Sequence, residues 1–429
     1  MSNDKSLILE RKMHRKKEEY KYFVGSTLKN SLEYEPGELI VFKIRPKFMD
    51  DYLDVPYVKY TLSAEHGEKK EELIKSSSDG WFYIETTIPE SGFAFVKAWA
   101  CDENGEAIND IDPYNGSAGA DVRNLKRATQ MPDDYMEFWE SMKKRVADSE
   151  PEVLYSKQID DRRYPDFATY DMRIKAPGSE YASFIVSYPK NAKPGELKFC
   201  MLFQGYGVNP ATVHAKPGYL TVNVCAHAIP NGEPPEFYKE LYSGALCKYG
   251  YKPEENESPE TSYFAGMLLR NLAVLRFFEN HELINKKDYY FVGSSQGGMQ
   301  ACNVAARFEK ATAVILNVPW LSDVHGCELA GRHKNGMPKG RGITYFDTAV
   351  AAELVQCPVY IISGLGDQSC NSSTQMALYN SIKSQKYIEF YQSKTHSYTI
   401  PWDNRMYSLG DSSMKEMYSE HTAEYYDWN

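Results

Sequence analysis

Gly293-Ser-Ser-Gln-Gly297 fits the pattern G-x-S-x-G, in which a serine stands at a sharp turn between two glycines. A strand-like apolar run from Tyr289 to Val292 precedes this stretch, and a helix-compatible run over residues 298–307 follows it. The glycines are needed because the turn brings two backbone segments close together and leaves the serine hydroxyl exposed at the start of the helix. A strand, a turn and a helix in this order indicate a nucleophilic serine, Ser295, in an α/β fold.

The second half of the chain alternates strand-like and helix-like segments. Strands are expected at residues 182–188, 198–203, 220–225, 289–293, 313–317, 359–363 and 388–391. Phe264, Leu268 and Leu272 recur at helical spacing, and another helix is expected over residues 132–146. Such alternation is typical of a mostly parallel sheet flanked by helices. Together with the serine turn it predicts an α/β-hydrolase fold for residues 126–429.

The first part of the chain has a different pattern, with short strands at close spacing. They are expected at residues 39–44, 58–62, 81–86 and 93–99, separated by clusters of Gly, Pro, Ser and Asp. This pattern predicts a small N-terminal β-sandwich domain over residues 1–125. The run of Asn, Gly and Ser at residues 115–120 is expected to be a linker or an exposed loop before the second domain.

A serine hydroxyl is a weak nucleophile at neutral pH, so Ser295 needs a histidine base and a carboxylate that orients it. In this fold the acid and then the histidine follow the serine along the chain. Asp367 comes just after the strand at 359–363, and His396 holds the equivalent place after the strand at 388–391. Both positions lie where active sites of open α/β sheets are found. Solvated or structural roles are expected for the competing residues, which are Asp323, Asp347, His325, His333 and His421.

Acyl transfer also needs N–H donors for the oxyanion that develops on the substrate carbonyl. The backbone N–H of Gln296, directly after the nucleophile, is expected to be the first donor. Tyr206 is expected to supply the second, because it stands in the glycine-bearing loop after the strand at 198–203. A plain turn is the alternative for this loop.

The rim of the pocket is assigned to residues 230–260, which are rich in Pro, Glu and Tyr and are long for a structureless connection. Tyr238, Tyr242 or Tyr263 is expected near the substrate.

Composition excludes several classes of partner. The net charge of −10 argues against nucleic acid, because affinity for phosphates depends on Lys and Arg. Apolar runs of about 18 residues, as membrane helices need, do not occur. The eight cysteines show no metal-binding spacing, so neither a metal nor another cofactor is expected. The chain starts at Met1 without a signal-peptide pattern, which predicts a cytoplasmic location, although a signal already removed would leave the same sequence.

With these elements in place, the chain resembles the acetyl xylan esterase and cephalosporin C deacetylase family of carbohydrate esterases over roughly residues 130–400. The likeness rests on Pro132–Trp139, Gly205-Tyr206, Gly293–Gly298, Val318–Leu321 and Asp367–Thr374, in which a cysteine stands three residues past the aspartate. The resemblance implies that Ser295, Asp367 and His396 form the catalytic triad. It also implies that Tyr206 and Gln296 line the oxyanion hole.

The resemblance further implies a serine carboxylesterase that removes acetyl groups from small sugars and xylo-oligosaccharides through an acyl-enzyme. Members of the family need no metal and commonly form ring-like hexamers, so a homo-oligomer is expected. Three departures mark this chain as a divergent member. The family's Arg-Gly-Gln motif is replaced near Ala226-His-Ala228, the usual diproline is Asn371-Ser372, and His396 is followed by Ser397 instead of Glu.

The N-terminal domain is an addition to the compact family pattern, and its role stays open between binding a partner subunit, covering the pocket and stabilising the fold. Two other functions are compatible with the sequence. An acyl-CoA thioesterase would need a pocket long enough for a fatty chain. A non-catalytic binding protein would use the sandwich as its working part, although the complete order of serine, acid and histidine argues against it.

Overall fold

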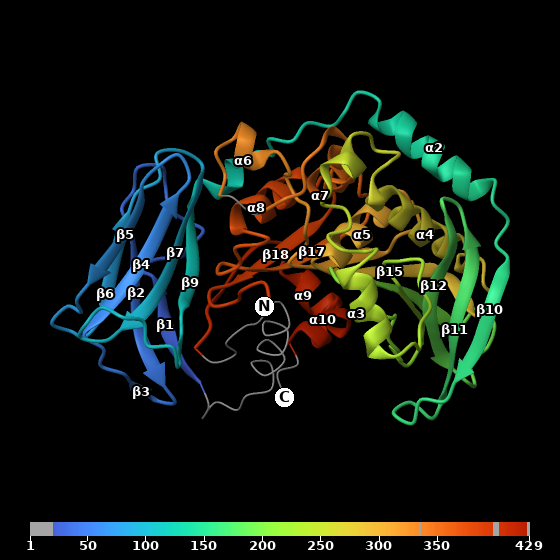
Figure 1. The fold of residues 1–429 in the computed structure, drawn as a ribbon, viewed down its shortest axis with the longest axis horizontal. Coiled ribbons are helices and arrows are strands. Elements are labelled where there is room, and N and C mark those ends of the chain that lie inside the picture. Colours follow the sequence, from blue (N-terminus) through green and yellow to red (C-terminus); the bar gives the residue numbers. More distant parts are fainter. Residues whose placement is uncertain (1–19, 334–335, 398–402, 427–429) are drawn as a thin grey trace.

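The computed structural model describes residues 20–333, 336–397 and 403–426 (Figure 1). Two sheets form the N-terminal part. The first contains β1 (Lys21–Thr27), β2 (Ile40–Phe48), β3 (Asp51–Tyr52), β6 (Phe82–Thr86) and β8 (Ile111–Asp112), and the second contains β4 (Tyr57–Ala64), β5 (Lys69–Ile74), β7 (Gly92–Cys101) and β9 (Tyr114–Ala120).

The two N-terminal sheets pack face to face because their strands bury alternate side chains. Phe42 and Ile44 of β2 lie in one apolar core with Leu62 of β4 and Val96 of β7. Polar residues alternate with the buried ones along these strands, such as the half-buried Lys43 of β2 and the exposed Lys59 of β4. The predicted β-sandwich is therefore confirmed, and residues 20–120 are called the sandwich below. The domain boundary at residue 125 stays a prediction.

The prediction of a linker at residues 115–120 was wrong, because these residues form most of β9, which pairs with β7 along its whole length. The small residues serve close packing here. A Cβ atom on Gly116 would overlap the Tyr114 hydroxyl and the Gln392 amide, and one on Gly119 would overlap Val122. Gly, Ser and Asn thus let the strand approach its neighbours closely.

The second part of the chain is built on a sheet of ten strands in the order β10-β11-β12-β14-β13-β15-β16-β17-β18-β19. Pairing is parallel from β14 to β18 and antiparallel at both ends. The strands are β10 (Val153–Ile159), β11 (Phe167–Ala176), β12 (Ser179–Pro189), β13 (Leu197–Phe203), β14 (Tyr219–Val224), β15 (Ile284–Ser294), β16 (Ala313–Asn317), β17 (Val359–Gly364), β18 (Lys386–Tyr391) and β19 (Met406–Gly410).

Helices cover both faces of this sheet (Figure 1). One face packs against α2 (Tyr135–Ala147), α4 (Tyr263–Phe278), α5 (Gln296–Ala305), α7 (Thr348–Ala352) and α8 (Ser372–Ser381), and the other against α9 (Ser413–Met417) and α10 (Ser419–Tyr426). The shorter elements are α3 (Pro235–Ser243), α6 (Gly326–Leu329), η2 (Val122–Asn124), η3 (Pro253–Asn256) and η4 (Arg341–Phe346). The parallel centre is buried on both sides and reads as continuous apolar runs, as predicted.

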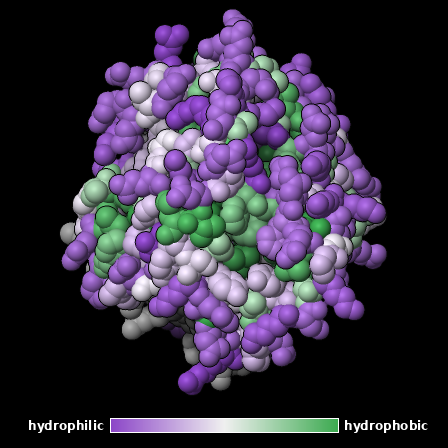
Figure 2. Space-filling model, turned by 90° about the vertical axis from the view of Figure 1, so that its right-hand side faces the viewer, coloured by the Kyte–Doolittle hydropathy of each residue, from purple (hydrophilic) through white to green (hydrophobic). Residues whose placement is uncertain are grey.

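The sandwich and β10 lie at opposite ends of the molecule (Figure 1). At the sandwich end, β7 contacts α8. At the other end β10 is the edge of the large sheet, and its Val153 and Leu154 are 46% and 49% exposed. Figure 2 views this side and shows apolar residues gathered in a band near its middle. Among the helices that the structure describes, none is long and apolar enough to cross a bilayer.

Candidate active site

Ser295 stands at a strained turn between β15, which ends at Ser294, and α5, which begins at Gln296. Its φ of 56° and ψ of −119° are unusual for a residue with a side chain. The turn is held by its own backbone groups, since Ser295 N donates to Asn317 O at 2.9 Å and Ser295 O accepts from Trp320 N at 2.9 Å. The predicted strand, turn and helix around the serine are all present.

Only glycine fits on either side of this turn. A Cβ atom on Gly293 would overlap the carbonyl oxygen of Gly297, and one on Gly297 would overlap the carbonyl oxygen of Phe203 at the end of β13. The two glycines of the motif therefore allow the turn to pack against itself and against the neighbouring strand.

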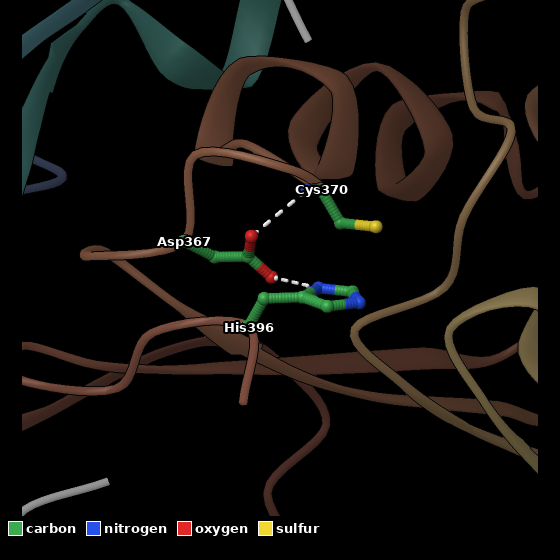
Figure 3. Close-up of side chains that lie close together, drawn as sticks. All are labelled: Asp367, Cys370 and His396. Carbon is green, nitrogen blue, oxygen red and sulfur yellow. Dashed lines mark hydrogen bonds and ion pairs between the residues drawn. The ribbon is translucent and has the colours of Figure 1, made fainter. Parts of the chain in front are cut away.

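The structure brings Ser295, Asp367 and His396 together in one hydrogen-bonded series. Ser295 Oγ lies 2.9 Å from His396 Nε2, and His396 Nδ1 lies 2.9 Å from Asp367 Oδ2. The other carboxylate oxygen of Asp367 accepts from the backbone N–H groups of Ser369 and Cys370, both at 2.8 Å (Figure 3). Because a carboxylate can only accept, Nδ1 carries a proton and Nε2 is left to accept from the serine hydroxyl.

Four influences set the pKa of His396. Burial lowers it, but the charge of Asp367 and its hydrogen bond raise it more, with Lys394 opposing them, so that the pKa of His396 lies above its usual 6.5. Asp367 is fully buried, which strengthens its effect on the imidazole.

The competing residues have structural partners. Asp347 caps α7 by accepting from Ala349 N and Val350 N, and Asp323 accepts from Ala128 N and Thr129 N and pairs with Arg332 at 2.6 Å. The contacts of the other histidines are Thr344 Oγ1 for His325, the ring of Phe95 for His333, and Tyr219 and Tyr290 for His421.

Asp367, Cys370 and His396 place potential metal-ligating atoms within 4.8 Å of one another (Figure 3). The chemistry of this set fits a metal poorly. Burial and the nearby Asp367 raise the pKa of the Cys370 thiol well above 9, whereas a metal ligand must be a thiolate. The facing atoms of Asp367 and His396 are already joined by a hydrogen bond.

One predicted oxyanion donor, Gln296, follows Ser295 directly, and the loop that carries the other, Tyr206, packs against Ser294. Gln296 is the first residue of α5, so its N–H precedes the first helical hydrogen bond, from Met299 N to Ser295 O. Residues 204–207, called the oxyanion loop, follow β13, and a Cβ atom on Gly205 would lie 3.6 Å from Ser294 O. Tyr206 is therefore placed beside the turn that carries the nucleophile.

Two residues that the sequence did not single out hold the oxyanion loop. The Tyr249 hydroxyl accepts from Gly207 N at 3.0 Å and lies 3.2 Å from Gln296 Oε1, so it joins both halves of the predicted oxyanion hole. His227 Nε2 lies 2.8 Å from Gly207 O. Burial lowers the pKa of His227 to about 4, so this ring is neutral. His227 stands in the stretch where, by the resemblance, the Arg-Gly-Gln motif is replaced. That replacement was the one sign in the sequence that this stretch could matter for the site.

The three tyrosines predicted near the substrate take different positions. Tyr238 is buried and bonds through its hydroxyl to Pro230 O and Glu233 N, so it stabilises the turn before α3. Tyr263 bonds to His227 Nδ1 at 2.6 Å. Tyr242 is 42% exposed, and its ring lies 6.5 Å from that of Tyr206. Substrate contact by these residues stays a prediction.

Comparisons with known proteins identify relatives of this chain. The sequence profile of the family described as Acetyl xylan esterase (AXE1) matches residues 120–335 and 329–410. Acetyl esterase Axe7A of Xylanibacter ruminicola is 24% identical over 278 residues, which are 61% of this chain and 63% of that protein. The chain thus spans less than two thirds of that relative's length.

Two solved structures share the fold. The acetyl xylan esterase from Paenibacillus sp. R4 covers 70% of this chain and 98% of its own, with 17% identity and a TM-score of 0.54. Acetyl xylan esterase 1 from Thermoanaerobacterium sp. JW/SL YS485 covers 71% and 98%, with 17% identity and a TM-score of 0.52. The predicted α/β-hydrolase fold is confirmed. Because the family profile matches more than half of the residues, this chain belongs to the acetyl xylan esterase family.

Proposed function

We propose that the protein is a serine carboxylesterase that removes acetyl groups from acetylated sugars or xylo-oligosaccharides through an acyl-enzyme. The observation that carries the proposal is the hydrogen-bonded series from Ser295 through His396 to Asp367, with 2.9 Å at each step. It stands at a serine turn, and we propose that the backbone N–H groups of Gln296 and Tyr206 complete the arrangement that acyl transfer requires.

The steps follow from this arrangement. Ser295 Oγ attacks the ester carbonyl while His396 Nε2 takes its proton, and the N–H groups of Gln296 and Tyr206 stabilise the negative oxygen. His396 then gives the proton to the sugar oxygen as the bond from carbon to that oxygen breaks. Water attacks the acetyl-serine while His396 takes one of its protons, and His396 returns that proton to Ser295 Oγ as acetic acid leaves, which ionises to acetate and a proton. Asp367 stabilises the imidazolium in both halves.

Aromatic residues close to the serine turn favour the proposal that the acyl group of the substrate is short. Trp320 is tied to Ser295 through its backbone N–H, and its ring lies 5.8 Å from that of Tyr251, which lies 5.8 Å from that of Tyr206. Aromatic rings in this neighbourhood could offer faces on which a sugar stacks, and we propose that they limit the acyl group to a short one. The acyl-CoA thioesterase alternative would need a longer channel here.

Purified protein is expected to release acetate from acetylated xylo-oligosaccharides. For nitrophenyl esters, kcat/KM for the acetate is expected to exceed that for the octanoate on the order of 100-fold, because the extra methylenes do not fit. Acetate release is measured enzymatically and nitrophenol by absorbance. A preference for octanoate or for acyl-CoA would favour the thioesterase, and no turnover of any ester would favour the binding protein.

Replacing Tyr249 by phenylalanine is expected to lower kcat about tenfold with little change in KM, because Gly207 N–H loses its partner and the oxyanion loop loosens. Steady-state kinetics on the nitrophenyl acetate measure the effect. The matched control is Tyr289→Phe, whose hydroxyl donates to Glu279 O at 2.8 Å away from the site. Equal kcat values for the two variants would argue against a role of Tyr249 in positioning the loop.

Two further features of the protein belong to the proposal. All eight cysteines are free and six of them are buried, which supports a reducing compartment such as the cytoplasm. A homo-oligomer is proposed from the family resemblance, and the exposed apolar residues of the β10 edge are a candidate contact.

A further inference from the structure

The sandwich contacts the two loops that carry the acid and the base of the proposed triad. The acid loop is residues 365–371, between β17 and α8, and the histidine loop is residues 392–397, after β18. Gly366 N donates to Lys394 O at 3.0 Å, so the two loops are also joined to each other. Strands β7 and β9 of the sandwich lie on the side nearest α8 (Figure 1).

The acid loop is held from β9. Ser117 Oγ lies 2.7 Å from Ser372 Oγ, and both side chains are buried. Gly366 packs so closely on the backbone of Asn115 that a Cβ atom there would lie 2.7 Å from the Asn115 carbonyl oxygen. The contacts fall one residue before Asp367 and five residues after it, so they bracket the acid.

Glu65 adds a buried carboxylate to this contact. Its exposed fraction is 3%, and one of its oxygens accepts from Ser373 Oγ at 2.9 Å and from Phe93 N at 3.0 Å. The other oxygen accepts from His333 N at 2.7 Å. His333 O in turn accepts from the Asn371 amide at 3.1 Å. The Glu65 side chain thus holds the start of α8 at two points, directly at Ser373 and through the His333 backbone at Asn371.

The histidine loop is held by Gln392, which is buried four residues before His396. Its amide nitrogen donates to the Tyr114 hydroxyl of β9 at 2.6 Å, and its amide oxygen lies 3.3 Å from Ser31 Oγ. Both partners belong to the sandwich.

These contacts account for one departure from the family pattern. By the resemblance, Asn371 and Ser372 stand where two prolines are expected, and each uses its polar side chain here, Asn371 towards His333 O and Ser372 towards Ser117. Proline could make neither bond. The added domain and the altered acid loop therefore fit each other.

We propose that the sandwich positions the catalytic triad, with Glu65, Ser117 and Tyr114 holding the acid and histidine loops so that Asp367 and His396 stay within hydrogen-bonding distance. The inference rests on the proposed function. None of the three residues needs to touch the substrate, so they are positioning residues. A displacement of about 1 Å in a catalytic group can cost on the order of 100-fold in rate, so such support matters.

The test is Glu65→Gln in the full chain. Glutamine keeps the shape but turns one accepting oxygen into an NH₂ group that faces a donor. We expect kcat to fall about 10- to 100-fold with KM little changed. We also expect the acid limb of the kcat/KM profile to move to lower pH, because a weaker contact with Asp367 lowers the pKa of His396. The charged group that also faces His396 is Lys394, and the variant leaves it in place.

The matched control is Glu72→Gln, because Glu72 also accepts a hydrogen bond within the sandwich, from the Tyr60 hydroxyl at 2.6 Å, but among the described residues it has no bond to the acid or histidine loop. It is expected to keep the kcat and the pH profile of the parent protein. A variant that only lowers stability would reduce the amount of folded enzyme without moving the acid limb.

If Glu65→Gln fails to fold, as judged by circular dichroism, the positioning role is tested with Ser117→Ala and Tyr114→Phe instead. Each of these variants is expected to lose about three- to tenfold in kcat. Folded variants with the parent's kcat and acid limb would overturn the positioning role. A parent protein without Ser295-dependent ester hydrolysis would instead overturn the proposed function, and the positioning role with it.

Discussion

Ser295→Ala is expected to lower kcat for ester hydrolysis by roughly 10⁶-fold, which is the order of loss seen when a triad serine is removed from a serine hydrolase. No covalent acyl-enzyme can form without the hydroxyl. The oxyanion donors and the aromatic rings remain, so substrate should still bind and KM should change little. The same loss is expected on nitrophenyl acetate and on acetylated xylo-oligosaccharide.

The fold of this variant should be intact. The backbone bonds of Ser295 to Asn317 and Trp320 do not involve the hydroxyl, and the hydroxyl itself bonds to His396. Thermal unfolding should therefore be close to that of the parent. Ser294→Ala is the matched control, because the neighbouring hydroxyl accepts from the Asn317 amide at 2.9 Å and should be dispensable for most of the activity. Hydrolysis that survives in Ser295→Ala and not in Ser294→Ala would contradict the assignment.

The three residues of the proposed triad could be picked out from the sequence because each of them follows a buried strand, in a fixed order. Ser295 is marked by its glycines, and Asp367 and His396 come soon after β17 and β18, whose apolar residues are visible in the sequence. Once β15, β17 and β18 are recognised as parallel strands of one sheet, with β16 between the first two, their carboxyl ends are expected at the same edge of that sheet. The chemistry of the site is thus encoded locally, strand by strand.

Elements without such local signals were missed. The strand β10 exposes most of its residues because it is the sheet edge, so it shows no clear alternation. Residues 115–120 have the composition of a loop, yet the glycines there serve close packing in β9. In both cases the tertiary surroundings, and not the local pattern, determine the strand.

Contacts between segments far apart in the chain could not be predicted from the sequence either. No sequence pattern shows that the side chains of Tyr249 and His227 bond to the backbone N–H and the carbonyl oxygen of Gly207. The bond between Glu65 and Ser373 joins residues 308 positions apart. Only the three-dimensional structure relates the sandwich to the acid loop, which is why its role stayed open until the contacts were seen.

Asp367→Asn is expected to lower kcat about 10⁴-fold near neutral pH, the size of effect known when the triad aspartate of a serine protease is replaced in this way. The asparagine oxygen can still accept from Ser369 N and Cys370 N, which turns its NH₂ group towards His396 Nδ1. Nδ1 must then accept, so the proton moves to Nε2. In that tautomer His396 cannot take the proton of Ser295.

The pH profile gives this variant a second signature. The base is active when neutral, so in the parent protein activity is lost as the pH falls through the pKa of His396, which Asp367 raises above 6.5. Without the carboxylate this pKa falls, and the acid limb of kcat/KM should move to lower pH. An acid limb that stays in place would mean that another group sets it.

Cys370→Ala is the control that separates a triad from a metal site. The backbone N–H of Cys370 bonds to Asp367, and alanine keeps that bond, so activity should stay within a few-fold of the parent. If the three side chains instead acted as ligands, loss of the sulfur should cost about as much as loss of the carboxylate. A large fall for Asp367→Asn alone therefore supports a carboxylate that works through His396, whereas equal falls would contradict it.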